Sequence, residues 1–234
     1  MSARLSHSFV SPVKTGLRDA LPVILGLVPF GLTIGSAVAT SGMSIAAGWI
    51  GGPALVAGAA HLSIVTALST GTAPFLAVAT AIFINLRFAA YSAAMAPLFD
   101  NQPRWFRWTG PYLIFDQVFA LATGRPEATV ERDWFRSYWI ALTGPIVLSW
   151  VLLISAGIGG GSMIPDHWQL WFVAPLMFSA ILAPTFGETR SMRAAFTAAV
   201  VAVAGTGLPD GVGLVLAIAL GVAAGSTGAA SADE

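Results

Sequence analysis

The sequence predicts an all-α, polytopic integral membrane protein: a helical bundle of seven or eight transmembrane helices, some of them broken by glycine and proline. Hydrophobic residues make up 56% of the chain and charged residues only 9%. A soluble domain carries roughly 25% charged residues, so this chain has too few to cover a surface in water. The charges also separate long uncharged windows, and one bilayer crossing requires about 20 apolar residues. Tryptophans gather near the ends of several windows, where the membrane interface favours them.

Eight windows of low charge follow one another along the chain, and each is predicted to be a helix. They are residues 21–39, 44–67, 73–99, 108–123, 134–158, 168–186, 192–205 and 212–226. The last two are shorter than a full crossing needs, which leaves the number of spans at seven or eight. The first window contains no charged residue, and the next three contain one ionisable residue each: His61, Arg87 and Asp116.

The basic residues predict the orientation, because cytoplasmic loops carry an excess of lysine and arginine. With eight crossings, Arg104 and Arg107 lie on one side of the membrane. The other side holds the remaining loop cations: Arg4, Lys14, Arg18, Arg125, Arg132, Arg136, Arg190 and Arg193. Both termini are therefore predicted in the cytoplasm. Window 44–67 is predicted to cross completely, because a re-entrant segment there would move the group from Arg125 to Arg136 outside.

The chain is predicted to form one transmembrane transporter domain over residues 20–227, between a cytoplasmic segment (1–19) and a disordered tail (228–234). A basic start, an apolar run and Ala37-Val38-Ala39 also resemble a signal peptide with its cleavage site. The apolar run is longer than such a peptide and is broken by proline and glycine. These features favour a retained first span.

Composition excludes several classes of function. The chain has no cysteine, which excludes disulfides, thiolate nucleophiles and cysteine-ligated metals. Its net charge of zero provides no field that would attract nucleic acid. The sequence has neither a pair of histidines at zinc-ligand spacing nor a phosphate-binding glycine loop with lysine. We therefore expect no enzyme activity, no metal and no cofactor.

Proline and glycine interrupt the first two windows. Pro22, Pro29 and Gly31 lie in the first window, and Gly58 lies three residues before His61 in the second. Proline frees a backbone carbonyl, and in a bilayer such groups persist only inside protein or beside a wet cavity. Many secondary transporters build substrate sites from such discontinuous helices. These residues are candidates for a gate or a substrate cradle, with ordinary kinking and close helix packing as the alternative.

Arg87 and Asp116 are the main candidates for a site within the membrane. Arg87 lies about 14 residues into its window, near mid-bilayer at about 1.5 Å per residue, and its guanidinium keeps its charge. Asp116 lies midway along the fourth window and is the expected partner. The pair either only locks two helices together or forms a site in which Arg87 receives a substrate carboxylate.

Asn85 and His61 are further candidates for the same site. Asn85 is two residues from Arg87, about 200° around a helix, so both face one cavity only where the helix is unwound or surrounded by protein. His61 and Asp116 are candidate proton carriers, His61 because its ordinary pKa lies near physiological pH. The alternative for His61 is a buried hydrogen-bonding residue. Gln117 is a weaker candidate.

The order of these features resembles that of the AzlC family, the large subunit of bacterial branched-chain amino-acid exporters. The motifs that carry the resemblance are GLRDALP (16–22), VPFG (28–31), AGAAH (57–61), INLRF (84–88), APLF (96–99) and DQVFAL (116–121). The family usually has glutamine where this chain has His61 and glutamate where it has Gln117, so coupling and substrate can differ from its better-known members. The resemblance implies an inner-membrane exporter of leucine, isoleucine and valine that works with a small AzlD-type membrane partner.

We therefore predict a subunit of a proton-coupled transporter that exports small hydrophobic amino acids, with Arg87, Asn85, Asp116 and His61 at the substrate site. Two alternatives belong to other classes. One is a non-transporting structural or regulatory membrane subunit. The other is an intramembrane hydrolase built around His61 and Ser63, against which the spacing argues, because residues two apart on one helix are poorly placed for activation of a serine.

Overall fold

The computed structural model describes residues 11–125, 132–160, 179, 187, 189–208 and 212–226. All regular structure within these ranges is helical, which confirms the predicted all-α class. Nearly all of the predicted window 168–186, together with Arg4 and the tail 228–234, lies outside the described residues.

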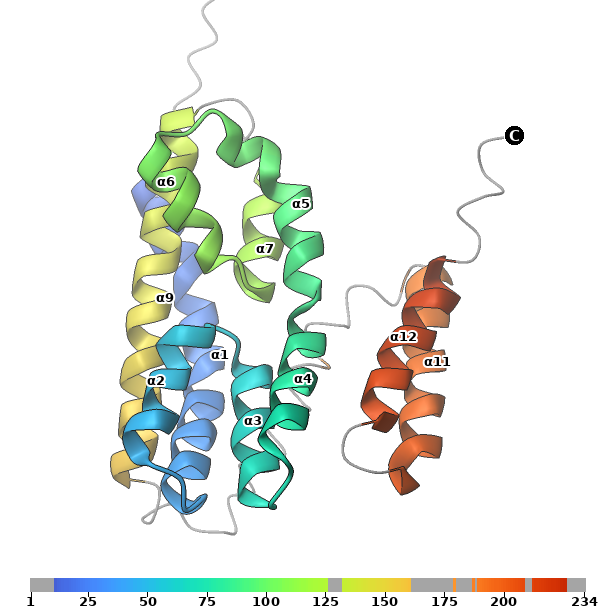
Figure 1. Ribbon diagram of the computed structural model, residues 1–234. Coiled ribbons are helices and arrows are strands. Elements are labelled where there is room, and N and C mark those ends of the chain that lie inside the picture. The colour runs from blue at the N-terminus through green and yellow to red at the C-terminus, as the bar shows by residue number, and fades with distance from the viewer. Residues whose placement is uncertain are drawn as a thin grey trace, which may run out of the picture.

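Three helical stretches among the described residues are long and apolar enough to cross a membrane. They are α1 (Pro12–Thr40), the consecutive helices α4 (Pro74–Asn85) and α5 (Arg87–Asp100), and α9 (Arg132–Gly160). Helices α1 and α9 pack along each other as the spine of the bundle (Figure 1). Their backbones approach closely, because a Cβ placed on Gly35 would lie 2.7 Å from the Cα of Gly157.

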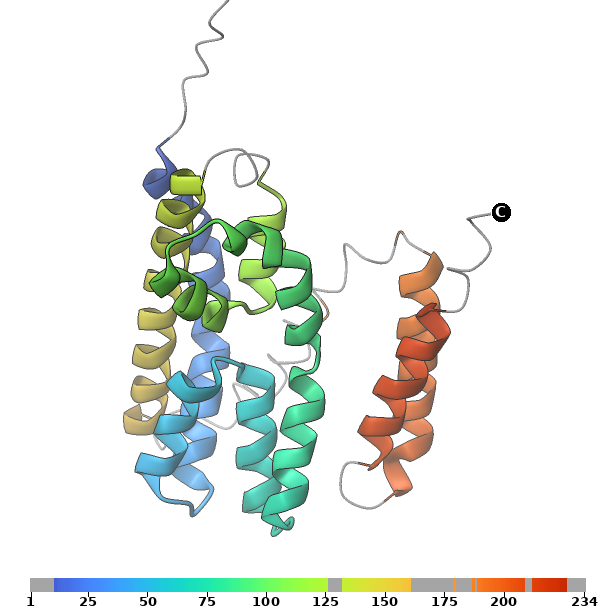
Figure 2. The same cartoon turned by 45° about the horizontal axis from the view of Figure 1, so that its top comes forward.

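The predicted crossing 44–67 is instead a helical hairpin. Helix α2 (Ile45–Leu55) and helix α3 (Gly58–Ser69) lie side by side and antiparallel, and they are joined at about half the depth of the bundle (Figures 1 and 2). At about 1.5 Å per residue, neither helix is long enough to cross a bilayer alone. The prediction of a full crossing was wrong, because a turn at Val56 and Ala57 sends the chain back to the end it came from.

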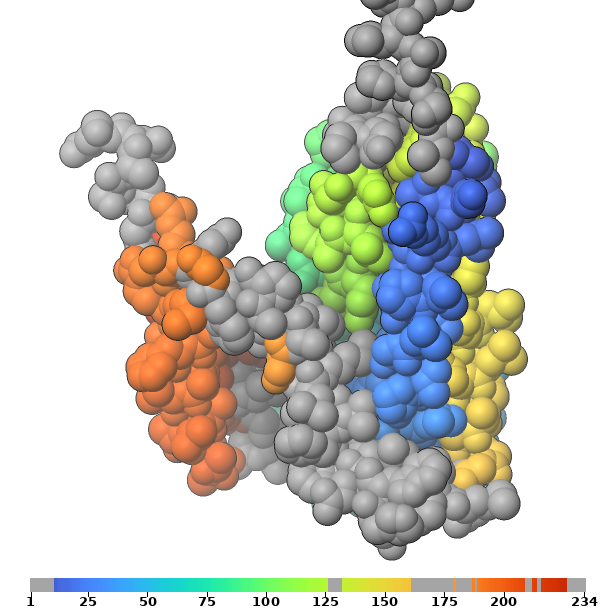
Figure 3. All heavy atoms as spheres, turned by 180° about the vertical axis from the view of Figure 1, so that it is seen from behind, coloured from blue at the N-terminus to red at the C-terminus, as the bar shows by residue number. Residues whose placement is uncertain are grey.

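The predicted crossing 108–123 is a second hairpin, which dips in from the other end. Helix α6 (Arg104–Thr109) and the 3₁₀ turn η1 (Gly110–Leu113) lead to mid-depth, and α7 (Asp116–Thr123) leads back (Figure 1). Figure 3 shows α7 beside the upper half of α1, seen from behind. The two hairpin tips touch, since the Tyr112 hydroxyl donates to the carbonyls of Pro53 at 2.8 Å and Ala54 at 2.6 Å.

Two hairpins in place of two crossings bring the basic residues to one end of the molecule, which we call the basic end. It lies at the top of Figure 1 and contains the starts of α1, α6 and α9 and the end of α7. Gln102 donates to the Arg132 carbonyl at 2.9 Å across this end. Every described lysine and arginine between residues 11 and 160 except Arg87 belongs to these segments: Lys14, Arg18, Arg104, Arg107, Arg125, Arg132 and Arg136. The prediction that separated Arg104 and Arg107 from the other cations was therefore wrong.

The last described helices form a hairpin of their own. Helix α11 (Thr189–Ala204) is followed by the short turn η6 (Gly205–Gly207) and by α12 (Val212–Ser226), and the two helices pack together. Small residues allow this contact, because a Cβ on Gly221 would lie 2.9 Å from the Ala198 Cβ. In a membrane, where apolar burial drives association weakly, such close approach is the usual basis of helix pairing.

An aromatic cluster joins the second hairpin to the spine near the basic end. Phe99, Phe106, Phe135 and Trp139 pack in edge-to-face, stacked and tilted pairs, with ring centroids 5.2 to 6.2 Å apart. All four are buried. Edge-to-face aromatic pairs contribute roughly 0.5–1.5 kcal/mol each beyond their buried area, so this cluster holds α6 against α9.

Candidate functional site

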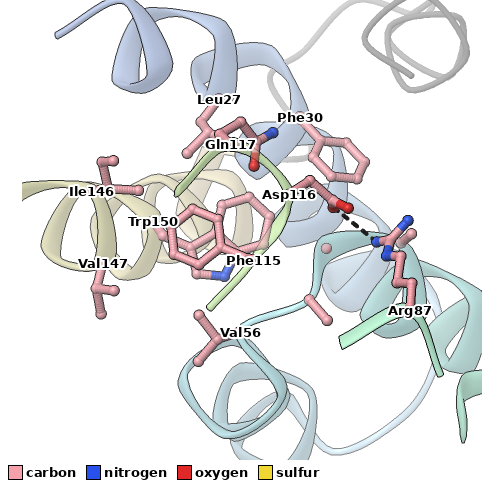
Figure 4. Close-up of a pocket in the computed structure, with 13 residues that line it drawn as sticks. Leu27, Phe30, Val56, Arg87, Phe115, Asp116, Gln117, Ile146, Val147 and Trp150 are labelled. Atoms are coloured by element: carbon pink, nitrogen blue, oxygen red, sulfur yellow. Dashed lines mark ion pairs between the residues drawn. The ribbon is translucent and has the colours of Figure 1, made fainter. Parts of the chain in front are cut away.

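A pocket lies at mid-depth, where the two hairpin tips meet the junction of α4 and α5 (Figure 4). The first tip contributes residues 56–59 and the second tip residues 115–117. Arg87 comes from the junction, and the remaining walls come from α1 and α9: Leu27, Phe30, Ile146, Val147 and Trp150. The empty space among them is about 480 Å³, including the open space at its mouth. The chain therefore places a partly polar cavity at the depth where a bilayer is most apolar.

Three helices begin at this pocket. They are α3 at Gly58, α5 at Arg87 and α7 at Asp116, and none has a side-chain hydrogen bond at its N-cap, which is Ala57, Leu86 and Phe115 respectively. The first amide groups of a helix have no acceptor within the helix, and the helix dipole adds a partial positive charge there. The pocket is thus lined by amide donors suited to an anionic group.

Arg87 and Asp116 form the ion pair that the sequence predicted. A terminal guanidinium nitrogen of Arg87 lies 2.9 Å from an Asp116 carboxylate oxygen, as Figure 4 shows. The Tyr91 hydroxyl donates to the other oxygen of Asp116 at 3.0 Å. The Arg87 side chain is 29% exposed and the Asp116 side chain 13% exposed. The pair is therefore shielded yet open on one side to the cavity.

The helix break at Leu86 explains how Arg87 reaches the cavity. Leu86 separates α4 from α5, and Asn85 is the last residue of α4. Asn85 does not line the pocket. Its side-chain oxygen is buried without a hydrogen-bond partner among the described residues. The geometry brings Arg87 and Asp116 together and leaves Asn85 beside the site rather than in it.

His61 ties the two helices of the first hairpin together and does not line the pocket. The side chain is 2% exposed, and its Nε2 lies 2.8 Å from the Gly48 carbonyl. A Cβ on Gly51 would lie 2.7 Å from the same nitrogen, so α2 can approach α3 here only because Gly51 has no side chain. The other ring nitrogen, Nδ1, is buried without a partner among the described residues. The proton-carrying role of His61 stays a prediction.

The predicted helix breakers have different surroundings. Pro22 and Pro29 lie inside α1, which continues through both, and the Thr33 hydroxyl donates to the Pro29 carbonyl at 2.8 Å. Gly31 allows α1 to contact Leu153 of α9. Gly58 begins α3 at the pocket, against the ring of Phe30. Of these four residues, only Gly58 lies at an interruption of the described helices.

The pocket also contains functional candidates that sequence reasoning missed. Phe30, Phe115 and Trp150 form much of its apolar wall (Figure 4). The Trp150 indole N–H is buried without an acceptor among the described residues, and a buried unpaired donor beside a cavity suits a ligand acceptor. The sequence does not reveal this role, because a lone tryptophan in an apolar run looks the same wherever it packs. The role depends on which distant parts of the chain surround the tryptophan in the fold.

Val56 turns the chain at the first hairpin tip with a left-handed backbone, at φ 45°. A β-branched residue rarely adopts this conformation, and such strain concentrates at functional sites. A glycine would take the turn more easily, but it would leave this side of the pocket without an apolar wall.

A second ion pair, between Arg125 and Asp19, lies at the basic end of the molecule. The Nε of Arg125 donates to Oδ2 of Asp19 at 3.0 Å, and a terminal nitrogen of Arg125 donates to the same Oδ2 at 2.6 Å. The Tyr138 hydroxyl also donates to this oxygen, at 2.8 Å. The hydrogen bonds to Asp19 raise the pKa of Arg125 above its ordinary value. This network joins α1, the end of α7 and α9. Among the described residues, no group of three or more His, Asp or Glu side chains is arranged to hold a metal ion.

Comparison with known proteins agrees with this architecture. A family model described as AzlC protein matches residues 22–164, which is more than half of the chain. The inner membrane protein YgaZ of Escherichia coli K12 is 24% identical over 183 residues, covering 76% of this chain and 74% of that protein. An uncharacterized membrane protein of Helicobacter pylori J99 is 26% identical over 155 residues, covering 60% of this chain and 66% of that protein. No solved structure matches the chain.

Proposed function

The chain belongs to the AzlC family, a family of membrane transport proteins, and on that premise we propose that it is the large subunit of an exporter of small hydrophobic amino acids. The observation that carries the proposal is the Arg87–Asp116 ion pair, which opens to an apolar pocket at mid-depth. A zwitterion with an apolar side chain needs these three elements: a cation, an anion and an apolar wall.

The substrate carboxylate would bind at the positive side of the pocket. Arg87 supplies a guanidinium that can hold a carboxylate through two parallel hydrogen bonds. The amides that begin α3 and the Trp150 N–H supply further donors. Because all of these groups converge on one cavity, the carboxylate would exchange water for several fixed donors at once.

The ammonium would bind Asp116, and the side chain would contact the aromatic wall. Asp116 accepts from Arg87 and Tyr91 when the pocket is empty, so the site carries no net charge before binding. A zwitterion brings one charge of each sign and keeps the site neutral. This balance favours a neutral amino acid over an anion or a cation, because an uncompensated charge at mid-membrane is costly.

The two hairpins provide the moving parts of an alternating-access cycle. They dip in from opposite ends and meet at the pocket, so withdrawal of either tip would open the site to its own end only. Asp116 and His61 are the candidate carriers of the coupling proton. A small AzlD-type membrane subunit is the proposed partner, and the bacterial inner membrane, with the basic end in the cytoplasm, is the proposed location.

The direct test is uptake of radiolabelled leucine into inverted membrane vesicles that contain this chain with its small membrane partner. Replacing Arg87 with Gln removes the carboxylate-binding charge and leaves Asp116 unpaired. Loss of one member of a buried charge pair typically costs about 2–5 kcal/mol. We therefore expect Arg87→Gln to reduce uptake by at least about tenfold. Arg136→Gln, which removes the exposed pair with Asp133, is the matched control and should transport normally.

A charge exchange separates a substrate site from a structural lock. The double variant Arg87→Asp, Asp116→Arg keeps an ion pair but exchanges the positions of its two charges. The negative charge then lies at the start of α5 and the positive charge at the start of α7. If the pair is a substrate site, we expect this double variant to assemble but not to take up leucine. Restored uptake in this variant, or normal uptake in Arg87→Gln, would favour a pair that only holds the helices together.

A further inference from the structure

The start of α6 carries an exposed cationic hollow that lies outside the transport site. Arg104 and Arg107 are one helical turn apart, and both are exposed. Together with Trp108 they surround a shallow hollow with about 630 Å³ of empty space, open solvent included. Neither guanidinium has a hydrogen-bond or ion-pair partner among the described residues.

Two exposed tryptophans flank this arginine pair. Trp108 is 83% exposed and Trp105 is 56% exposed, whereas Phe106 between them is buried against Phe99 and Phe135. Indole rings favour the membrane interface, where the apolar ring and the polar N–H are both satisfied. The buried Phe106 fixes which way α6 faces, so the arginines and tryptophans point out of the bundle at its basic end.

The chemistry of the pair suits a phosphate. Arginine binds phosphate oxygens through paired hydrogen bonds and is more weakly hydrated than lysine. The hollow belongs to the basic end of the molecule, and the leaflet that a basic end faces is the one rich in anionic lipids. We propose that Arg104, Arg107 and Trp108 bind the phosphate of an anionic phospholipid headgroup.

The site would have a mechanical consequence, because α6 is the outer limb of the second hairpin. The tip of that hairpin carries Asp116, and its base begins at Arg104. A lipid held at the base fixes one end of the hairpin and leaves the tip to move. Lipid binding at this hollow does not depend on which substrate the pocket holds, so it can be tested separately from amino-acid export.

The test measures binding of fluorescently labelled phosphatidylglycerol to the purified full-length chain in neutral detergent. We expect Arg104→Gln, Arg107→Gln to weaken binding by about 10- to 30-fold, since each basic residue near the surface contributes substantially to anionic-lipid binding. Arg104→Lys, Arg107→Lys should retain most of the binding. Unlabelled phosphatidylglycerol should displace the label, whereas phosphatidylcholine should do so only weakly.

A second cationic pair at the same end is the matched control. Lys14 and Arg18 are exposed and also about one turn apart, on α1, but no tryptophan adjoins them in the sequence. Lys14→Gln, Arg18→Gln should change lipid binding less than twofold. Equal losses in the two double variants would overturn the site in favour of general charge attraction.

Two further outcomes would also overturn the proposal. Displacement of the labelled lipid by millimolar inorganic phosphate would assign the hollow to free phosphate. Unchanged lipid binding combined with loss of a membrane partner from the Arg104→Gln, Arg107→Gln variant would assign it to a protein surface.

Discussion

Gly58 shows how one residue sets the size of the pocket. It begins α3, and a Cβ placed on it would collide with the Phe30 ring and lie 2.9 Å from Trp150. Phe30 and Trp150 are themselves in contact, with ring centroids 5.8 Å apart. A methyl group at position 58 must therefore displace at least one of these rings, and both rings line the pocket.

We expect Gly58→Ala to reduce leucine uptake severalfold more than it reduces stability. Overpacking by one methyl group typically costs about 1–3 kcal/mol, and here the displaced ring also belongs to the wall of the proposed substrate pocket. The measurement is uptake in inverted vesicles together with the thermal unfolding midpoint of the purified protein. Gly144→Ala is the control, since nothing lies within 4 Å of its added Cβ. Normal uptake in Gly58→Ala would show that the substrate does not pass this position.

For individual residues, the sequence predicted the pairing of charged side chains better than it predicted the packing contacts of apolar ones. An arginine and an aspartate deep in apolar windows must find partners, so the Arg87–Asp116 pair was predictable from depth alone and is confirmed. The contacts of Gly58 and Trp150 were not predictable. They depend on which helices meet, and a glycine or tryptophan in an apolar run is compatible with many neighbours.

At the scale of elements, the two hairpins were the main error of the sequence-based prediction. Hydropathy detects the length of an apolar run but not a reversal within it, and 24 apolar residues fit either one crossing or two half-helices. The signals at the turns were weak: Val56 and Ala57 at one tip, Ile114 and Phe115 at the other. None of these four is a usual turn residue. Gly58 and the Gly110-Pro111 pair lie nearby, but similar pairs occur inside continuous helices, such as Gly144-Pro145 within α9.

The hairpin tips are joined by one side chain, which makes their contact testable. The Tyr112 hydroxyl bonds the carbonyls of Pro53 and Ala54, at the end of α2. We expect Tyr112→Phe to weaken the tip contact by about 0.5–1 kcal/mol. Amides in the first turn of α3 should then exchange with deuterium about two- to fivefold faster in reconstituted protein.

Tyr138→Phe provides the matched control for the tip contact. Its hydroxyl bonds Asp19 at the basic end, far from the tips, so the same loss of a hydroxyl should leave the exchange of α3 unchanged. If both variants accelerate amide exchange in α3 equally, the hydroxyl of Tyr112 does not hold the tips together. The faster exchange then reflects a general loss of stability.

At the scale of the whole molecule, the charge asymmetry is greater than the sequence suggested. Eight full crossings divide the ten loop cations eight to two, as Arg104 and Arg107 fall on the far side. Re-entry of window 44–67 alone would have worsened this division, which was the reason to reject it. Re-entry of both 44–67 and 108–123 gathers every described loop cation from Lys14 to Arg136 at one end. The cations therefore separate by end only when both windows are re-entrant, and the cytoplasmic orientation itself stays a prediction.

The hairpins make a topological prediction that differs from eight crossings. Ser44 precedes α2 and Ser69 ends α3, so the hairpin places both on the membrane side opposite the basic end. Asn101 follows α5 and Thr123 ends α7, so both lie at the basic end. Eight crossings instead put Ser44 and Ser69 on opposite sides, and likewise Asn101 and Thr123.

The natural chain has no cysteine, so single-cysteine variants at these four exposed positions report their location without a background. In intact cells, a membrane-impermeant maleimide should label Ser44→Cys and Ser69→Cys. It should label Asn101→Cys and Thr123→Cys only in inverted vesicles, because we expect the basic end to face the cytoplasm. Labelling of Ser44→Cys and Ser69→Cys from opposite sides would contradict the first hairpin. Labelling of the basic-end pair in intact cells would contradict the orientation but keep the fold. The four variants thus test separately the two features that the transport cycle requires: hairpins from opposite ends, and a basic end in the cytoplasm.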